Sequence, residues 1–413
     1  MKVLAFTTVF PNPALPVRGL FVYERIRHAA RHAEVRVVAP VPWFHRRERA
    51  QTPRREVRGG LAVEHPTFFY VPFVGKYLDG LFLFLSALAC VARLRREFDF
   101  DLIDGHFGYP DGFAAVLLGW YFRRPVTLTL RGSETEHLTH PVKRWAMAWA
   151  WRRAARVMAV AHPLGVMAEK LGVPPERVRV IPNGVDGARY APGDAAASRK
   201  QLGRPETGKL LVSVGHLSAR KGFHRVLRVL PELLRDFPDL TFVIVGGMEA
   251  AGTYEGQMRR QVAELGLSER VVLAGPQPPE VVARWLRAAD LFVLASTREG
   301  CPNVVWEAMA CGRPVVATRV GEVDRIVPDY AGILYDRVED DAELLRCLRE
   351  GLSRPWDTGR IRAHAEQHTW EQVAAAVLDE WRAAVGDGPV APAARAEETE
   401  DRRCHQAAGR DTR

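Results

Sequence analysis

The sequence is poor in cysteine, and this scarcity argues against a disulfide framework. Its 413 residues include five cysteines, namely Cys90, Cys301, Cys311, Cys347 and Cys404. None belongs to a CxxC pair, so the spacing also argues against a zinc site. Scattered single cysteines are typical of proteins in a reducing compartment, and we therefore expect a cytoplasmic protein.

The sequence has no long apolar run, and we expect no secretory leader at its N-terminus. Only Lys2 precedes a short apolar run that ends at Pro11, with no cleavage site, so we expect the first β-strand there. The most apolar segment, residues 81–92, is shorter than the span of about 20 residues that crosses a bilayer. We expect a helix buried against a sheet. The alternative is a helix that touches the membrane beside a group of arginines at residues 46–58.

The charge balance is basic, with a formal net charge of +9. The densest basic group comprises Arg46, Arg47, Arg49, Arg54, Arg55 and Arg58. Such a group suits phosphorylated ligands or an anionic membrane surface, and a solvated basic loop is an equal alternative. No zinc finger, RNP-type aromatic pattern or basic recognition helix accompanies it, so we expect no nucleic-acid partner.

The order of apolar and helical segments predicts an α/β protein with two doubly wound parallel sheets in tandem. Strands are expected at residues 2–9, 35–39, 102–104, 126–130, 210–214, 241–245, 271–273, 291–294 and 314–318. We expect a first domain at residues 1–190 and a second at 191–368, with the ligand in the crevice between them. A helix at 369–385 is expected to cross back to the first domain, and residues 386–413 to be a disordered tail.

A strand, a loop and a helix between residues 291 and 316 form the strongest candidate site. The loop covers residues 296–303, a helix is expected at 304–311, and Gly312 and Pro314 end it. Free backbone N–H groups at a helix start bind anions such as a nucleoside diphosphate. The residues expected around this anion are Gly300, Cys301, Pro302, Asn303 and Val304, of which Pro302 has no N–H.

Two carboxylates frame this loop, Glu299 before the helix and Glu307 within it. Carboxylates accept hydrogen bonds from vicinal hydroxyls, as acidic residues do from ribose in dinucleotide-binding folds. One carboxylate can therefore hold a ribose diol and the other a sugar hydroxyl. Each of them alone would be an ordinary surface charge.

The spacing of these residues resembles a known family. Glu299, seven intervening residues and Glu307 followed by AMACG are similar to the E-x7-E motif of the retaining glycosyltransferases of family four. The resemblance extends from Met1 to about Val385 and implies the GT-B fold, two Rossmann-like domains with the active site between them. It also implies a nucleotide-sugar donor, with Glu307 on the ribose, Glu299 on the hexose and the amides of residues 300–304 on the sugar and diphosphate.

The form of the motif here, EGCPNVVWEAMACGRPVVATRVG, resembles the subgroup that makes cell-envelope and exopolysaccharide chains. The more usual EGFGLP is replaced by EGCPNV, so side-chain contacts inside this loop are not carried over from the family.

The segment VGHLSARKG resembles the VGRLxxxKG segment of the same family. By that match Lys221 reaches the donor phosphates, a task suited to a flexible ammonium group. The family's arginine is replaced by His216, whose neutral imidazole cannot act as a permanent bidentate cation. Arg220 either compensates for this change or is a solvated arginine at a helix start.

Three segments of the first domain also resemble the family. In FPNPALPVRGLFVYE, Gly19 would let the backbone approach the diphosphate. In DGHFGYPDG, His106 matches a histidine that lines the sugar pocket. In TLRGSE, Arg131 would face a donor phosphate or an acidic acceptor, with Glu134 where Asp is commoner.

Two further segments match family turns. In IPNGVD we assign Asn183, Gly184 and Asp186 to structure and not to chemistry. The segment GPQPPE lies where relatives contact the base, mostly through backbone groups. It places Gly275, Pro276 and Gln277 in that position.

We expect no metal and no cofactor. The triplet at residues 99–101 is similar to a metal-binding DxD motif but precedes a strand, so we interpret it as a turn. Other acidic residues and histidines lack convincing metal spacing.

The sequence therefore predicts a retaining, metal-independent hexosyltransferase that acts on a glycan or lipid-linked acceptor in envelope or exopolysaccharide synthesis. The expected catalytic residues are His106, Lys221 and Glu299. The alternatives are a nucleotide-sugar epimerase of the same fold and a catalytically idle nucleotide-sugar binder. We expect a cytoplasmic protein, with peripheral binding to the inner face of the cell membrane as an extension.

Overall fold

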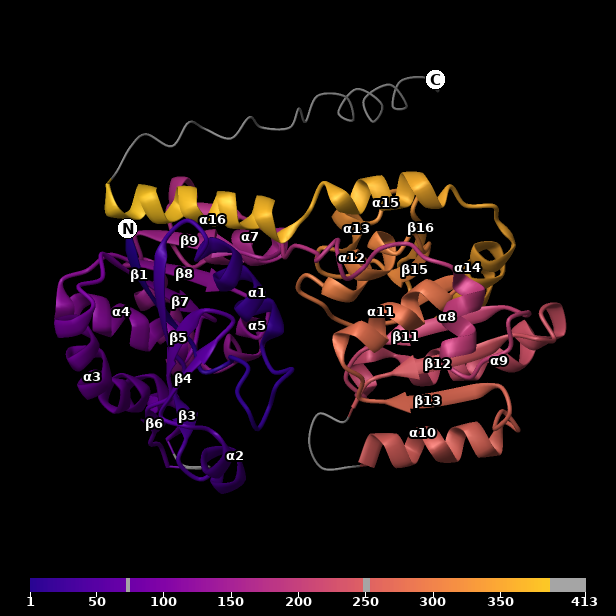
Figure 1. Cartoon of the computed structure of the whole chain (residues 1–413), viewed down its shortest axis with the longest axis horizontal. Coiled ribbons are helices and arrows are strands. Elements are labelled where there is room, and N and C mark those ends of the chain that lie inside the picture. The colour runs from indigo at the N-terminus through magenta and orange to yellow at the C-terminus, as the bar shows by residue number, and fades with distance from the viewer. Residues whose placement is uncertain (72–74, 248–252, 387–413) are drawn as a thin grey trace, which may run out of the picture.

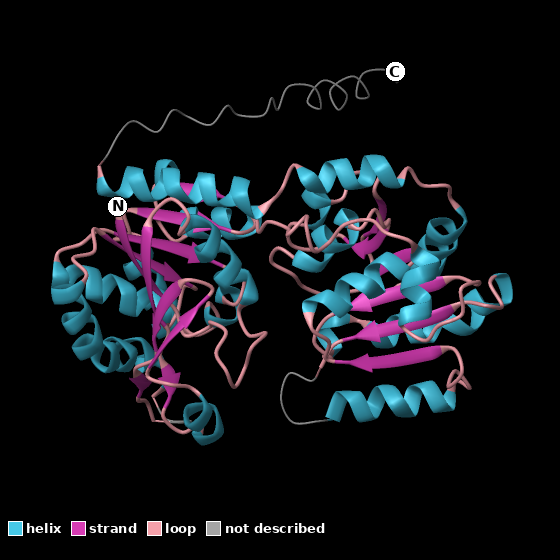
Figure 2. Ribbon diagram, viewed as in Figure 1, coloured by secondary structure: helices cyan, strands magenta, loops and turns pink. Residues whose placement is uncertain are grey.

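The structure is a computed structural model that describes residues 1–71, 75–247 and 253–386. The described residues form two α/β domains side by side, each with a central sheet covered by helices on both faces (Figure 1; Figure 2). This confirms the predicted pair of doubly wound sheets. The predicted disordered tail lies, apart from Gly386, outside the described residues.

The first domain contains an eight-stranded sheet in the order β10-β9-β8-β7-β1-β2-β5-β4, parallel except for the β4–β5 pair, and a small β3–β6 pair. Its strands are β1 Lys2–Phe6, β2 Glu34–Val38, β3 Val41–Pro42, β4 Arg55–Arg58, β5 Leu61–Glu64, β6 Thr67–Phe68, β7 Leu102–His106, β8 Val126–Leu130, β9 Arg156–Ala159 and β10 Val178–Val180. Its helices are α1 Leu20–Ala29, α2 Arg46–Gln51, α3 Asp79–Glu97, α4 Asp111–Phe122, α5 Glu134–His137, α6 Pro141–Trp151 and α7 His162–Lys170, with 3-10 turns at Lys76–Leu78 and Pro175–Arg177.

The second domain contains a six-stranded parallel sheet in the order β13-β12-β11-β14-β15-β16. Its strands are β11 Leu210–Val214, β12 Thr241–Val245, β13 Val271–Gly275, β14 Leu291–Leu294, β15 Val315–Thr318 and β16 Gly332–Tyr335. Its helices are α8 Ala195–Gln201, α9 Phe223–Asp236, α10 Thr253–Glu264, α11 Pro279–Ala288, α12 Asn303–Ala310, α13 Val323–Ile326, α14 Asp341–Ser353 and α15 Thr358–Glu366, with a 3-10 turn at Ala219–Lys221.

The last described helix, α16 Trp370–Val385, returns to the first domain and packs beside α1 (Figure 1). Its inward residues, among them Val377 and Trp381, join the core formed by β1, β2 and α1. The opposite face of the same sheet is covered by α3, α4, α6 and α7, whose apolar sides form a second core layer. A capping box at Thr369 fixes the start of α16.

The apolar segment at residues 81–92 lies in α3, as a helix packed against the sheet. One side of α3 is buried, with Leu83, Ala87, Val91 and Leu94 in the core, because these positions recur at helical spacing. The opposite side, with Leu81 and Leu85, is exposed. The prediction of a buried helix is therefore correct for one face only.

Candidate functional site

The strand order of each sheet decides where loops can build a site. In the first sheet, β2 lies on one side of β1 and β7 lies on the other, so the strand order switches at β1. In the second sheet, β12 and β14 flank β11 in the same way. Ligands of doubly wound folds bind at the carboxyl ends of the strands at such switch points. Gly19 follows β1, His106 ends β7, Lys221 follows β11 and Glu299 follows β14, so all four predicted residues lie at switch-point ends.

Lys221 and Glu299 are brought into direct contact. Nζ of Lys221 lies 2.6 Å from Oε1 of Glu299, which also accepts a hydrogen bond from the hydroxyl of Ser296 at 2.6 Å. Arg220 lies 3.6 Å from the other carboxylate oxygen and donates to the carbonyl of Arg298 at 3.0 Å. Two cations thus lie beside one carboxylate in the β14 loop, where the side chains of Lys221 and Glu299 are only 11% and 7% exposed.

His216 is exposed after β11. No hydrogen bond or ion pair of its side chain is found in the described part of the chain. The stem of Lys221 packs against Gly215, whose added Cβ would lie 3.2 Å from Cε of that lysine. Position 216 is therefore next in sequence to the glycine on which Lys221 rests.

Helix α12 begins at Asn303, one residue earlier than predicted, and ends at Ala310. Gly312 has φ of 72°, and the N–H of Arg313 reaches the carbonyl of Ala308 at 2.9 Å. This is the predicted glycine-terminated helix end. Pro302 occupies the N-cap, and Val304 and Pro302 are buried, whereas Gly300, Cys301 and Asn303 are half-buried.

The β14 loop also meets the first domain. A Cβ added to Gly300 would lie 2.9 Å from the carbonyl oxygen of Arg131, and one added to Gly132 would lie 3.5 Å from Cα of Gly300. The two backbones therefore approach each other without intervening side chains. Because these segments follow β14 and β8, the carboxyl ends of the two sheets face one another here.

Glu307 lies on α12 and is half-buried. Burial raises its pKa from the ordinary 4.5 to about 7, and nearby Arg189 and a hydrogen bond from Tyr190 only partly offset this effect. Tyr190 is itself buried. A carboxyl held in this state releases its proton readily when a ligand supplies hydroxyl donors.

His106 is fully buried at the end of β7. Its Nδ1 lies 3.1 Å from Nη2 of Arg131, which can only donate, so the ring proton belongs on Nε2, 3.2 Å from Oδ2 of Asp104. Burial, reinforced by Arg131 and Arg25, lowers the His106 pKa to about 4, although Asp104 opposes the shift. The imidazole is therefore neutral near pH 7.

Asp104 and Arg25 lie beneath this histidine. Burial disfavours the charge of Asp104, but the adjoining His106, the hydroxyl of Thr127 at 2.7 Å and Arg25 outweigh it and hold the pKa of Asp104 below its ordinary value. Arg25, on α1, is fully buried, and its Nε and Nη1 have no hydrogen-bond partner. Burial lowers the pKa of Arg25 to about 10, with Asp104 opposing the shift.

Glu134 is a fully buried carboxylate that organises two loops. It accepts backbone N–H bonds from Gly108 at 2.8 Å, from Arg131 at 3.1 Å and from Gly132 at 2.5 Å. The loop after β7 is thereby tied to the loop after β8. This explains an acidic residue at this position without any contact to substrate.

Arg131 continues the network toward the second domain. Its Nη1 donates to Oδ1 of Asn183 at 3.2 Å, and Nδ2 of Asn183 donates to Oδ1 of Asn303 at 2.8 Å. The chain of side chains from His106 to the start of α12 thus crosses between the domains. Asn183, which we assigned to structure, is the link between two predicted site residues.

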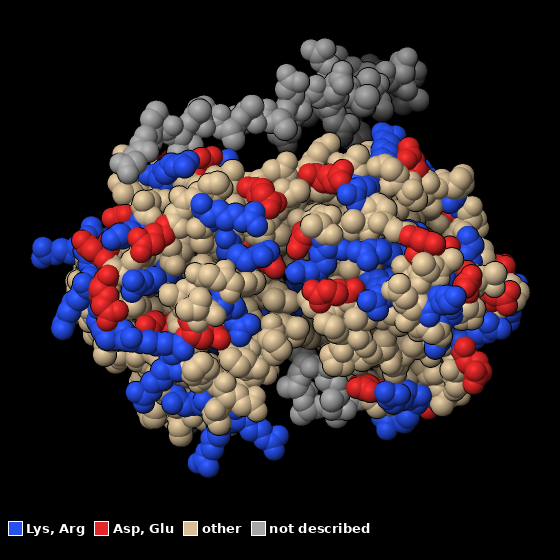
Figure 3. All heavy atoms as spheres, viewed as in Figure 1, with Lys and Arg blue, Asp and Glu red and all other residues tan. Residues whose placement is uncertain are grey.

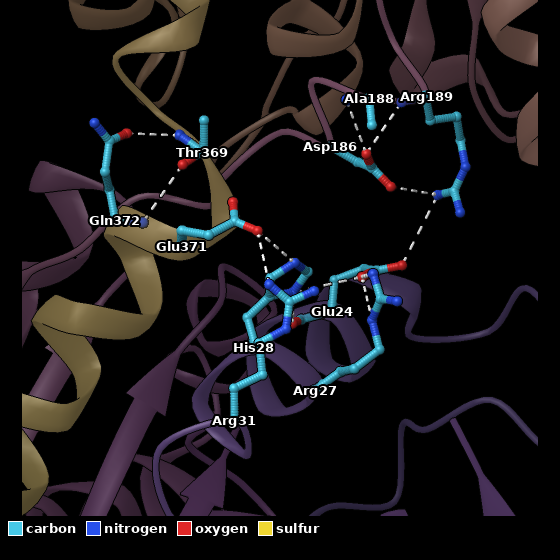
Figure 4. A network of polar contacts seen from close by, with 10 residues as sticks. All are labelled: Glu24, Arg27, His28, Arg31, Asp186, Ala188, Arg189, Thr369, Glu371 and Gln372. Carbon is cyan, nitrogen blue, oxygen red and sulfur yellow. Dashed lines mark hydrogen bonds and ion pairs between the residues drawn. The ribbon is translucent and has the colours of Figure 1, made fainter. Parts of the chain in front are cut away.

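A second polar network lies around the segment that leads from the first domain to the second (Figure 4). Arg189 lies 3.8 Å from Glu24 on α1. It also lies 3.4 Å from Glu280 on α11, so it joins both domains. Asp186 accepts backbone N–H bonds from Ala188 and Arg189, each at 3.1 Å, which supports its structural assignment. Glu371, in the first turn of α16, lies 3.2 Å from His28.

The backbone conformation at position 19 and the close approach of Val9 require a glycine there. Its φ is 70°, and an added Cβ would lie 2.4 Å from the carbonyl oxygen of Val9. Its approach to a diphosphate remains a prediction. Among the predicted base contacts, Gly275 has φ of 67°, Pro276 packs near Gly247, and Gln277 donates to the carbonyl of Ala274 at 2.6 Å.

Arg25 and Asp104 were not among the residues predicted for the site. A usable signal exists, since Asp104 interrupts a fully buried strand and a buried charge needs a partner or a function. Within residues 1–71, 75–247 and 253–386, no group of three or more His, Cys, Asp or Glu residues is arranged to hold a metal ion.

Comparison with known proteins identifies the family of the chain. Residues 19–189 match the family model described as Glycosyltransferase Family 4, and residues 194–368 match that described as Glycosyl transferases group 1. The chain is 31% identical over 349 residues to the teichuronic acid biosynthesis glycosyltransferase TuaC of Bacillus subtilis (strain 168), covering 81% of this chain and 85% of that protein. It is 34% identical over 230 residues to a D-inositol 3-phosphate glycosyltransferase of Acidothermus cellulolyticus, covering 54% and 51%.

Solved structures share the fold. The structure of Anabaena Alr3699/HepE in complex with UDP matches with a TM-score of 0.73 and 22% identity, covering 92% of this chain and 99% of the other. Sucrose-phosphate synthase from Thermosynechococcus elongatus matches with a TM-score of 0.75 and 19% identity, covering 94% and 100%. With family models on both halves and TuaC aligned along most of the chain, this protein belongs to the glycosyltransferases of the GT-B fold.

Proposed function

We propose that this glycosyltransferase moves a hexose from a nucleoside-diphosphate sugar to a glycan or lipid-linked acceptor, with retention of anomeric configuration and without a metal. The observation that carries the proposal is the contact of Lys221 and Glu299 beside the start of α12. It supplies a cation for a diphosphate and a carboxylate for a sugar hydroxyl within one loop system.

The donor would exchange partners with this ion pair. Its diphosphate would attract Lys221 and the free N–H groups at the start of α12, and Arg220 would add a second cation. Glu299, released from Lys221, would then accept a hydrogen bond from the hexose. Glu307 would hold the ribose diol, and the backbone near Gly275 the base. UDP is the first nucleotide to test, because HepE has been solved with UDP and with UDP-glucose.

Retention needs either a carboxylate nucleophile or attack on the face from which the diphosphate leaves. Glu134 is committed to three backbone N–H groups, and Asp104 lies beneath His106. Neither of these carboxylates is free, which supports same-face attack. In that route a donor phosphate oxygen accepts the proton of the acceptor hydroxyl, while Lys221 stabilises the departing diphosphate. His106 and Arg131 would line the sugar side.

The acceptor proposal rests on the relatives. TuaC is named for teichuronic acid biosynthesis, and it aligns over most of this chain. We therefore place the reaction in envelope or exopolysaccharide synthesis, in the cytoplasm and peripherally on the inner face of the cell membrane. No cofactor besides the donor is invoked.

The proposal is tested with UDP-, GDP- and ADP-hexoses. A bound donor stabilises the fold by mass action, so the correct nucleotide should raise the melting temperature above the others. That donor, supplied with membrane extract and a chelator, should give a glycoside with the anomeric configuration of the donor by NMR. An inverted product or a strict metal requirement would refute the mechanism.

The two alternatives give different products. An epimerase would convert the nucleotide sugar with no acceptor present. An idle binder would be stabilised by the nucleotide but would leave the donor intact with every acceptor tried. Either result would replace the transferase proposal.

A further inference from the structure

The exposed apolar side chains are distributed unequally between the domains. Among the described residues, all but one of the exposed large hydrophobic side chains lie in the first domain, and the exception is Leu265. Trp120 is 80% exposed and Trp145 is 60% exposed, which is unusual for indole rings. Exposed apolar side chains that gather on one face indicate an interaction surface.

Most of these side chains belong to one face, here called the outer face, on the solvent side of the layer formed by α3, α4 and α6. It comprises Trp43, Phe69, Val71, Tyr77, Leu78, Leu81, Leu85, Trp120, Tyr121, Val142 and Trp145. Its parts are physically connected. Phe84 of α3 packs against Tyr121 at 6.4 Å between ring centroids, and the N–H of Phe69 bonds to the hydroxyl of Ser86 on α3 at 3.0 Å.

Helix α3 forms the ridge of the outer face. Residues 81–92 carry no charged side chain, and Lys76–Glu97 is long and apolar enough to cross a membrane by length and composition alone. Its inner side, however, is fixed in the core by Leu83, Ala87, Val91 and Leu94. A helix anchored in this way can lie along a membrane surface with its outer side in contact, without spanning it.

A basic groove adjoins the outer face. This groove, of about 880 Å³, lies between α4, α6 and the start of β8 and is lined by Trp120 and Trp149. Its charged lining residues are all arginines, namely Arg123, Arg124, Arg153 and Arg177. The guanidinium of Arg153 lies 4.5 Å from the centre of the Trp149 ring. Cations and indole rings together match an anionic headgroup at the boundary of an apolar phase.

Other basic side chains extend the positive charge along the domain. Arg46 and Arg47 are exposed on α2, three and four residues after Trp43, and Figure 3 shows basic side chains at this lower end of the first domain. In contrast, Arg55 and Arg58 pair with Glu64 and Glu56 on the β4–β5 hairpin. The predicted arginine group is therefore divided, and only its first part accompanies the outer face.

We propose that the outer face docks on an anionic lipid bilayer, with the arginine–tryptophan groove holding lipid phosphate headgroups. Trp120, Trp145 and Leu85 enter the interfacial region, while the arginines attract the surface. The second domain, which lacks such a face among its described residues, stays in solution. This inference deepens the proposed function by naming how the enzyme reaches a lipid-linked acceptor. The role of the docking rests on the proposed function, whereas the docking itself does not.

The orientation of the outer face relative to the candidate site suits access to a lipid-linked acceptor. Helices α4 and α6 begin near the carboxyl ends of β7 and β8, because they connect parallel strands of one sheet. Tyr77, at the start of α3, stacks on His140 at the start of α6 with 6.0 Å between ring centroids. The outer face thus reaches the edge of the sheet that carries His106 and Arg131.

The apolar part is tested by vesicle flotation of the full chain. Vesicles contain phosphatidylcholine alone or with phosphatidylglycerol, and no donor is present. We expect Trp120→Ser/Leu85→Gln to weaken binding to anionic vesicles at least tenfold. The matched control is Val57→Gln/Leu265→Gln, which removes two exposed apolar side chains away from the outer face and should bind as the unmodified protein does. Trp120→Phe, which keeps an aromatic ring, should retain most of the binding.

The groove is tested by charge removal. We expect Arg153→Ser/Arg177→Ser to reduce binding about fivefold for each arginine, and this difference should disappear at high salt. The control Arg235→Ser/Arg260→Ser removes the same charge from the second domain and should have little effect. Donor-induced stabilisation of all these variants should be unchanged, so loss of vesicle binding is distinguishable from failure of the proposed transferase.

Three results would overturn the proposal. One is unmodified protein that floats with neither vesicle composition. Another is equal loss of binding in the outer-face variants and their controls. The last is binding of a soluble polyuronate at the groove without vesicle binding, which would assign the groove to an acidic glycan.

Discussion

The guanidinium of Arg131 donates from Nη1 to Oδ1 of Asn183 at 3.2 Å and thereby joins the end of β8 to the segment that leads into the second domain. The amide of Asn183 then donates to Asn303 at 2.8 Å. One buried amide therefore serves an arginine of the first domain and a helix start of the second.

Replacement of this amide should cost stability. Asn183→Ala leaves a buried guanidinium N–H without its acceptor, and we expect the free energy of unfolding to fall by about 1–3 kcal/mol. Urea denaturation measures this change. Asn183→Asp keeps an acceptor for Arg131 and should lose less. Equal losses in both variants would show that the hydrogen bond contributes little.

Gly300 should control how closely the domains meet. A Cβ there would lie 2.9 Å from the carbonyl of Arg131, so Gly300→Ala should separate the two loops and lower turnover. Small-angle scattering should show a larger radius of gyration. Gly256→Ala is the matched control, since its added Cβ meets no atom within 4 Å, and it should stabilise α10 slightly. An unchanged radius and turnover in Gly300→Ala would contradict the close approach.

The carboxylate of Glu307 should lower the stability of the fold at high pH and increase the affinity for nucleotide. Its pKa in the folded chain is about 7 against an ordinary 4.5, so the folded state holds the proton more tightly and stability is lost as pH rises between these values. Glu307→Gln should therefore melt at a higher temperature than the unmodified protein at pH 8 and yet lose nucleotide affinity sharply. Glu264→Gln, at an exposed carboxylate on α10, should change neither property. Unchanged nucleotide affinity in Glu307→Gln would remove it from the ribose site.

Lys221 should act on the departing diphosphate. Removal of one such electrostatic donor typically lowers kcat by about 10²–10³-fold, and we expect this for Lys221→Met in steady-state assays. The exposed Lys200 on α8 provides the control, and Lys200→Met should keep normal kcat. A change in KM alone would place Lys221 in ground-state binding.

His216 offers a gain-of-function experiment. It is exposed one residue after the glycine that supports Lys221, so His216→Arg adds a permanent cation beside the proposed phosphate position. We expect donor affinity to increase, because hydrogen bonds to charged groups contribute about 1.5–3 kcal/mol. Calorimetric titration with the donor nucleotide measures it. Unaltered affinity would mean that Arg220 already supplies this cation.

The sequence was most informative where strands are buried on both faces. Residues 126–130, 210–214, 241–245 and 291–294 were predicted with the bounds that the structure has, because each is a short apolar run between turn-forming residues. The short strands β9 and β16 were not predicted. Strand β9 begins at Arg156 and β16 begins at Gly332, so neither segment is an apolar run long enough to predict a strand.

The site was predictable where a motif is local and unpredictable where partners are distant in sequence. Glu299 and its helix could be located from one strand–loop–helix segment. In contrast, Arg131 and its partners His106 and Asn183 come from three separate segments that only the folded sheet brings together. A charge inside a buried element, such as Asp104, was the available signal for this second group.

The return of α16 also determines the order in which the chain can fold. Trp381 is fully buried in a core whose first strand begins at Lys2, and Glu380 on the same helix lies 3.0 Å from Arg179. During synthesis the first domain therefore waits, with part of its core uncovered, until the entire second domain has left the ribosome. We therefore expect the N-terminal half to expose part of its apolar core, and to be prone to aggregation, until α16, the last described helix, packs against it.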